Sequence, residues 1–225
     1  MKSHRILFFP GLLFILSLMG ASVAAAPPSL VKEKQCDTCH RFSREEPEQA
    51  GPDLFFAGDK FQTEWLKQFL KQPETIRPAG SSHDPGFLKG QPEMKSPHLA
   101  VKTEEAGQLT DYLSTLKIMK ESKPLSLESL SKGARVRVKI LFERDFSCIA
   151  CHQSYNLANQ PRGGVSGPSL TNAGNRLRPE WVYQWLKNPE QFRPHSRMPL
   201  YTFDEETLHR LTQYIMSHTK NQGRP

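Results

Sequence analysis

The chain has 225 residues, 37% of them hydrophobic, and a formal net charge of +7. This length suits two small domains better than one. A basic chain can bind nucleic acid, but no nucleic-acid-binding motif accompanies the charge, which argues against that class of function.

The N-terminal segment, residues 1–25, has the three-part layout of a secretory signal peptide. Lys2 and Arg5 precede an apolar run over residues 6–19, and small residues follow it. We therefore expect cleavage of this segment, export and a periplasmic mature protein. The segment is just long enough to span a bilayer as an uncleaved anchor, but a Pro-Gly pair interrupts it and its small-residue end favours cleavage.

Two segments of the chain repeat each other. Residues 51–78 align without a gap with residues 167–194, and 14 of the 28 aligned positions are identical. The sequence therefore predicts two copies of one unit of about a hundred residues. We place the units at 26–123 and 124–225, because the polar, proline-containing stretch 120–133 interrupts the helical pattern between them.

Apolar residues spaced three and four apart predict short amphipathic helices in each unit. The segments "TEWLKQFLKQP", from Thr63, and "PEWVYQWLKNP", from Pro179, both stop at a proline that cannot continue the helix. Thr103 and Asp204 are expected N-caps of two further helices with acidic first turns. No alternating pattern indicates strands, so the predicted fold class is all-α.

All four cysteines lie in two copies of Cys-x-x-Cys-His, one in each unit. A disulfide does not require the adjacent histidine, and a thioredoxin-like thiol pair would need a βαβ pattern that is absent. The two pairs could form a four-sulfur zinc site, but zinc explains neither the histidines nor why each pair heads its own repeat.

Cys-x-x-Cys-His is also the attachment signature of c-type haem. One turn of helix can carry both sulfurs to the porphyrin and the histidine to an axial position on iron. We therefore predict two covalently bound haem c groups. The thioethers would be formed by Cys36, Cys39, Cys148 and Cys151, and the axial ligands would be His40 and His152.

The order of motifs in each unit resembles that of class I cytochromes c. After Cys-x-x-Cys-His come Gly-Pro-x-Leu, a tryptophan-bearing helix and a closing helix with Leu-Thr-x-Tyr, preceded in the second unit by Arg-Met-Pro. The duplication resembles the two-domain dihaem cytochromes of the c4 type, over nearly all of the mature chain. This resemblance implies two tandem domains, each of three to four short helices wrapped around a haem, and a one-electron carrier rather than an enzyme.

The resemblance also implies the remaining iron ligands. Met198 stands where the family has its methionine ligand. The first unit departs from the pattern, because it has a 14-residue insertion and the aligned closing helices place Ser96 opposite Met198. We take Met94 as the first haem's ligand, with His98 and His83 as alternatives. A histidine there would give the first haem the lower potential.

The family also implies roles for residues around each haem. The carbonyl of the Gly-Pro proline accepts the second ring proton of the axial histidine, a role that passes to Pro52 and Pro168. The groups on the propionate side of the haems would be Lys60, Arg176, Trp65 and Trp181. The alternative for these four is an ordinary solvated cation or core indole.

The two units differ in charge. Residues 26–123 contain 14 Lys and Arg against 15 Asp and Glu, a balance of −1, and residues 124–225 contain 14 against 8, a balance of +6. We therefore expect the second unit to dock on an acidic redox partner, either a soluble protein or a membrane-associated oxidase or dehydrogenase complex.

Two alternatives to a free electron carrier remain. One is a dihaem enzyme, a peroxidase or small-sulfur-compound oxidoreductase, which would need an iron with an open or displaceable ligand. The other is an electron-transfer subunit of a larger respiratory or dehydrogenase complex.

Overall fold

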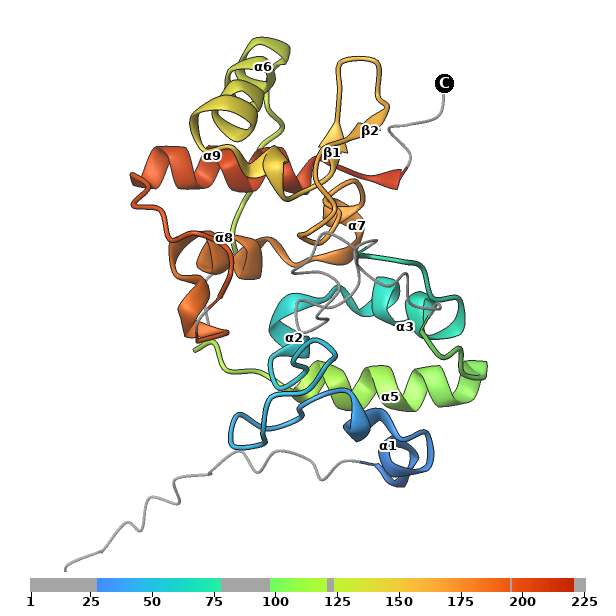
Figure 1. The fold of residues 1–225 in the computed structure, drawn as a ribbon. Coiled ribbons are helices and arrows are strands. Elements are labelled where there is room, and N and C mark those ends of the chain that lie inside the picture. The colour runs from blue at the N-terminus through green and yellow to red at the C-terminus, as the bar shows by residue number, and fades with distance from the viewer. Residues whose placement is uncertain (1–27, 78–97, 121–123, 195, 221–225) are drawn as a thin grey trace, which may run out of the picture.

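The computed structural model describes residues 28–77, 98–120, 124–194 and 196–220. These residues are mainly helical and form two halves, drawn blue to green and yellow to red in Figure 1. Among them, no helix combines the length and apolar character that crossing a bilayer requires.

The first half is built from short helices around one apolar cluster. Helix α3 packs against α5, and both contribute leucines to that cluster. The elements are α1 (Ser29–Glu33), the one-turn helix η1 (Cys36–Thr38), α2 (Ala57–Lys60), α3 (Thr63–Lys71) and α5 (Thr103–Thr115).

The second half has the same succession of a one-turn helix at the cysteines, a very short helix, a tryptophan-bearing helix and a closing helix. Helix α8 packs against α9 as α3 packs against α5. The elements are α6 (Lys132–Ile140), the π-helical turn η2 (Leu141–Asp145), η3 (Cys148–Ala150), α7 (Ala173–Arg176), α8 (Pro179–Lys187), η4 (Pro189–Gln191) and α9 (Glu205–Met216).

The predicted all-helical character holds apart from one small hairpin. Strands β1 (Ser154–Tyr155) and β2 (Pro161–Arg162) pair antiparallel within the second half. The sequence analysis missed them because two residues are too short for an alternating pattern. The two tryptophan-bearing helices α3 and α8 are confirmed, and each ends two residues before its proline.

The two predicted N-caps had different outcomes. Asp204 is confirmed, because its carboxylate accepts the backbone N–H of Thr207 at 2.7 Å. Thr103 is wrong by one position: α5 begins at Thr103, and Lys102 occupies the cap. The Glu105 carboxylate accepts the N–H of Lys102 at 2.9 Å, so the acidic residue in the first turn caps the helix without a hydroxyl at that position.

The two halves share apolar packing. Phe55 and Phe56, from the first half, belong to the core cluster of the second. The ring of Phe56 stacks on Trp181, with centroids 6.5 Å apart, and meets Phe192 edge-on at 5.4 Å. An aromatic ring of one half is therefore part of the other half's core.

Hydrogen bonds also join the halves, at equivalent positions of the repeat. Phe61 and Leu177 form an isolated antiparallel bridge. The N–H of Gln62 donates to the carbonyl of Arg176 at 2.9 Å, and the N–H of Arg178 donates to the carbonyl of Lys60 at 2.9 Å. The Gln62 side-chain amide donates twice more into the second half. Corresponding segments of the two copies thus meet directly.

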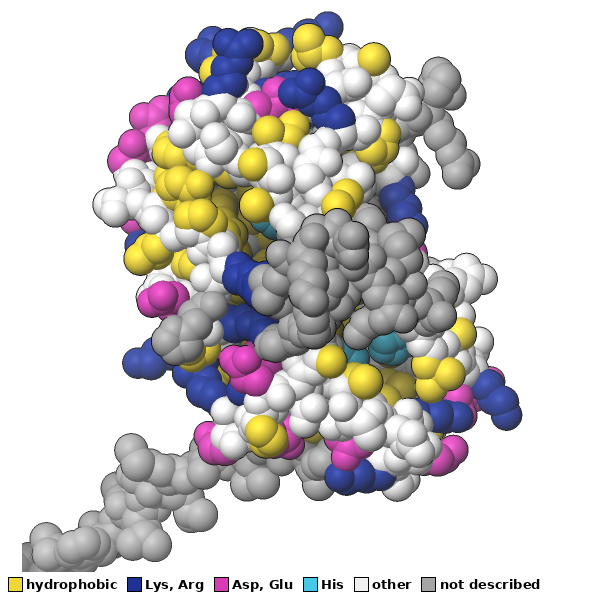
Figure 2. Space-filling model, viewed as in Figure 1, with side chains coloured by type: hydrophobic (Ala, Val, Ile, Leu, Met, Phe, Trp, Pro, Cys, Tyr) yellow, Lys and Arg dark blue, Asp and Glu magenta, His cyan; other side chains and the backbone are white. Residues whose placement is uncertain are grey.

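The surface drawn in Figure 2 is mixed in character. Lys and Arg side chains are spread over both halves, and hydrophobic side chains gather on one side of the second half.

Candidate haem sites

Each cysteine pair lies on a single tight turn. A residue in the left-handed conformation precedes it, Gln35 with φ 54° in the first half and Ser147 with φ 52° in the second. The N–H groups of His40 and His152 each donate to the carbonyl of their motif's first cysteine at 3.0 Å. The two sulfurs and the imidazole therefore leave the chain within one turn, as the signature requires.

The first cysteine of each motif lies in an environment that favours the protonated thiol. None of the four is in a disulfide. Burial raises the pKa of Cys36 and raises that of Cys148 to about 11. Because the thiolate is the form that binds zinc and attacks disulfides, these environments do not favour the zinc or redox-thiol alternatives. The described residues contain no group of three or more His, Cys, Asp or Glu side chains placed to hold a metal ion.

The histidine of each motif is oriented by a proline carbonyl. His40 Nδ1 lies 2.7 Å from the Pro52 oxygen, and His152 Nδ1 lies 2.8 Å from the Pro168 oxygen. A carbonyl can only accept, so each Nδ1 carries the proton and each Nε2 has a free lone pair. Burial lowers the pKa of both rings, which favours the neutral, ligating form.

The glycine before each proline allows this contact. A Cβ on Gly51 would lie 2.7 Å from His40 Nδ1, and a Cβ on Gly167 would lie 2.7 Å from His152 Nδ1. Such distances are too short for any side chain. The repeated Gly-Pro is therefore a steric requirement of the two histidine positions.

Met198 is partly buried and packs against the apolar cluster of the second half, as Cys148 does. The indole N–H of Trp185 donates to its sulfur at 3.0 Å. In the first half, Met94 and His83 lie outside the described residues. His98 is described, and its ring centroid lies 5.9 Å from that of His40.

Lys60 and Arg176 lie near each other at the junction of the halves. The Lys60 ammonium sits 4.9 Å from the ring centre of Phe61 and 5.0 Å from that of Trp181. Burial, with repulsion from Arg176 and Arg77, lowers the pKa of Lys60 to about 7. Burial also lowers the pKa of Arg176 to about 10. This region would therefore gain stability from an anion.

Two buried donors in the same region support this. Arg176 Nη2 donates to the carbonyl of Ser169 at 2.7 Å, but its Nε has no acceptor within the described parts of the chain, and neither has Trp181 Nε1. Buried donors without acceptors are costly, and a carboxylate such as a haem propionate would satisfy them. Trp65 differs from Trp181, because its indole already lies 3.5 Å from a Glu74 carboxylate oxygen.

The sequence analysis missed some members of this region. Arg77 is the arginine of the first Pro-Glu-x-x-Arg-Pro run, and burial with repulsion from Arg193 and Arg197 lowers its pKa. The repetition of this arginine in both copies of the run could have indicated its role from the sequence alone. Outside this region the sequence analysis also missed His218, which is 1% exposed, lies 3.2 Å from the Ser154 hydroxyl, and has a pKa that burial lowers to about 4.

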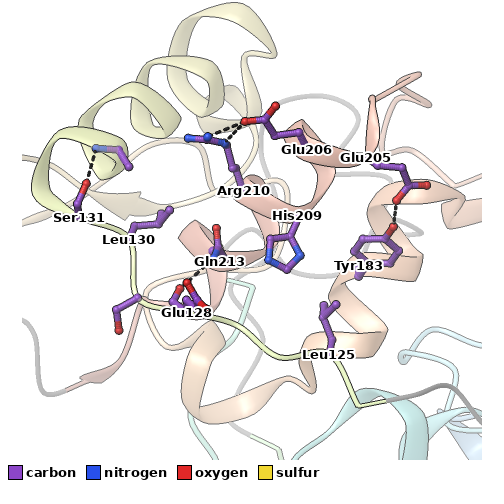
Figure 3. Close-up of a pocket in the computed structure, with 12 residues that line it drawn as sticks. Leu125, Glu128, Leu130, Ser131, Tyr183, Glu205, Glu206, His209, Arg210 and Gln213 are labelled. Atoms are coloured by element: carbon purple, nitrogen blue, oxygen red, sulfur yellow. Dashed lines mark hydrogen bonds and ion pairs between the residues drawn. The ribbon is translucent and has the colours of Figure 1, made fainter.

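A surface pocket elsewhere on the second half is not a haem site. It lies beside α8 and α9, where the Tyr183 hydroxyl donates to the Glu205 carboxylate (Figure 3). His209 lines it, but no residue of either cysteine motif does, and neither does Met198.

Comparisons with known proteins bear on the first half. No curated protein and no solved structure matches the chain. The family model described as Cytochrome c matches residues 25–117. This part of the chain is therefore similar to class I cytochrome c domains, a family that binds haem c covalently and carries electrons.

Proposed function

We propose that the protein is a periplasmic dihaem c-type cytochrome that passes single electrons between partner proteins. Its first domain would be residues 26–123 and its second residues 124–225. The proposal of a second haem rests on the repeated geometry of the histidines. His40 Nδ1 lies 2.7 Å from the Pro52 oxygen in the first half, and His152 Nδ1 lies 2.8 Å from the Pro168 oxygen in the second.

The chain's contribution is to hold and insulate the iron. Haem supplies the one-electron couple between ferrous and ferric iron. His40 and His152 provide one axial nitrogen each, and Met198 provides sulfur in the second half. The apolar clusters of both halves exclude water, which keeps the environment of each iron constant between oxidation states.

The junction between the halves supports relay within the molecule. Lys60 and Arg176 occupy equivalent repeat positions and lie on the two segments that bond to each other. If each binds a propionate of its own haem, the propionate edges of both haems face this junction. Electrons would then cross between the halves over a short, hydrogen-bonded contact.

The charge difference between the domains supports a docking role for the second. With a balance of +6, it would attract an acidic patch on a redox partner and accelerate the encounter. The rate of electron exchange with such a partner should fall as ionic strength rises, in a stopped-flow experiment. A rate independent of salt would remove this part of the proposal.

The decisive experiment is the mass of the matured protein. The full chain is produced in a host that attaches haem c, and its intact mass is measured. We expect the polypeptide without residues 1–25 plus two haems. Replacing Cys148 and Cys151 by serine should remove one haem, and replacing Cys36 and Cys39 should remove the other. A wild-type mass with one haem or none would overturn the dihaem proposal.

Carbon monoxide separates the carrier from the dihaem enzyme. An electron carrier with two six-coordinate irons should resist the gas when reduced. Rapid and complete binding at one haem of the wild-type protein would favour the enzyme instead.

A further inference from the structure

We propose that His98, rather than Met94, is the second axial ligand of the first haem, so that this iron is held by two histidines. The second iron would have His152 and Met198. This assignment rests on the proposed haem attachment in the first half and adds an asymmetry between the two haems.

The distance between the two imidazoles fits a shared metal ion. Their ring centroids are 5.9 Å apart, with 44° between the ring planes. A nitrogen–metal bond of about 2 Å and roughly 1 Å from nitrogen to ring centre, counted on both sides, give about 6 Å. His40 and His98 therefore lie at the separation that one iron between them would impose.

The hydrogen bonds of both rings leave the same nitrogen available. His40 Nδ1 lies 2.7 Å from the carbonyl oxygen of Pro52, and His98 Nδ1 lies 2.9 Å from the carbonyl oxygen of Leu99. Because carbonyls only accept, both Nδ1 atoms carry protons and both Nε2 atoms have free lone pairs. This is the tautomer that a ligating histidine adopts when a carbonyl orients it.

The same helix position supports the proposed ligand in each half. The His98 ring packs against Phe69 of α3, with centroids 5.4 Å apart. In the repeat, Phe69 aligns with Trp185 of α8, whose indole N–H donates to Met198. His98 therefore contacts, in the first half, the counterpart of the residue that contacts Met198 in the second.

The chain after His98 is fixed to the same helix. The N–H of Val101 donates to the carbonyl of Leu70, at the end of α3, at 2.9 Å. Phe69 in turn stacks on Trp65, with centroids 4.9 Å apart. The histidine is thus held on the side of α3 that faces His40.

A difference in ligands would give the molecule a direction. Thioether sulfur raises the potential of a haem relative to a second histidine. The first haem should therefore have the lower potential, so that electrons enter through the first domain and leave through the second. The basic second domain would then meet the acceptor.

The test uses the full, matured dihaem protein and counts methionine–iron bands in the near-infrared spectrum of the oxidised form. We expect one such band per two haems in the wild type. Met198→Ala should abolish it, and Met94→Leu should leave the spectrum unchanged. His98→Ala should let one reduced haem bind carbon monoxide while the methionine band of the other persists.

The variant His98→Met keeps the test decisive if His98→Ala does not accumulate. It should show two methionine bands and a raised potential for the first haem. Two bands in the wild type, loss of a band in Met94→Leu, or no spectral change in either His98 variant would overturn the assignment. The intact mass of the same samples reports haem attachment separately, so a missing haem would count against the proposed function and not against His98.

Discussion

The indole N–H of Trp185 donates to the sulfur of Met198 over 3.0 Å. Trp185 is itself held by its neighbours, with its ring 5.1 Å from that of Trp181 and 5.9 Å from that of Phe192. One lone pair of the sulfur is thus engaged, which leaves the other available to a metal ion. Trp185 therefore fixes the position of the Met198 side chain, and its hydrogen bond withdraws electron density from the sulfur.

Trp185→Phe should lower the potential of the haem proposed for the second half. The variant keeps an aromatic ring but removes the hydrogen bond, so the sulfur becomes a better donor to ferric iron. A hydrogen bond contributes about 1 kcal/mol, which corresponds to a fall on the order of 40 mV in a potentiometric titration. Tyr183→Phe, which removes an exposed hydroxyl on the same helix, is the control and should leave the potential unchanged. An unchanged or higher potential in Trp185→Phe would contradict the role given to this bond.

Gly51→Ala should destabilise the first domain. The added methyl group would lie 2.5 Å from the Cys39 carbonyl oxygen and 2.7 Å from His40 Nδ1, so the ring must move away from the Pro52 carbonyl. We expect a lower melting temperature in haem-monitored thermal unfolding, because overpacking costs about 1–3 kcal/mol.

Gly107→Ala is the matched control for that substitution. Nothing lies within 4 Å of a Cβ at this position inside α5, so the change should stabilise the helix by roughly 0.5–1 kcal/mol. If both alanines shifted the melting temperature in the same direction, the steric role of Gly51 would be wrong.

The sequence predicted α3, α5, α8 and α9, because these helices follow local patterns of apolar residues, caps and prolines. Pro73 and Pro189 end their helices by steric exclusion, and the spacing of the apolar residues fixes which face is buried. The insertion of Phe56 into the second core and the bonds of Gln62 to the second half could not be predicted. Both depend on how the two copies pack, which no local pattern records.

The second axial ligand proposed for the first haem also could not be predicted from local sequence patterns. Met94 was chosen from its spacing along the chain, since it precedes Leu109 of the closing helix by 15 residues and Met198 precedes Leu211 by 13. His98 gained support only when the structure placed its ring beside Phe69 and opposite His40. An insertion makes distance along the sequence a poor guide to distance in space.

Lys60 should make the potential of a nearby haem depend on pH. Without a neighbouring anion, burial lowers its pKa to about 7, so the lysine is partly neutral near physiological pH. An electron added nearby favours the ammonium form, and the propionate also raises the pKa. Reduction therefore takes up a proton between the pKa of the oxidised form and the higher pKa of the reduced form.

The sign of the effect follows from that proton uptake. The potential should be constant below the oxidised-form pKa and fall as pH rises through the window above about 7, by at most about 59 mV per pH unit. Lys60→Met should remove this slope, and Lys67→Met, at an exposed position of α3, should retain it. A slope that survives in Lys60→Met would assign the proton to another group.

Gln62→Ala should weaken the junction of the halves without removing its backbone bonds. The side-chain amide donates to the carbonyl of Gly174 at 2.7 Å and to that of Leu177 at 2.8 Å. Losing both bonds should cost about 1–3 kcal/mol. We expect faster proteolytic cleavage between the domains and slower electron transfer from one haem to the other after rapid photoreduction.

Gln68→Ala is the control for this variant, because Gln68 is exposed on α3 and its side-chain amide donates to Gln72 in the same half. The two readouts distinguish the roles of the junction. Faster cleavage with an unchanged transfer rate would mean that the junction holds the domains together but that electrons do not cross there. Slower transfer with unchanged cleavage would mean that the Gln62 amide holds the Lys60 and Arg176 segments in the arrangement that relay needs, without contributing measurably to the cohesion of the halves.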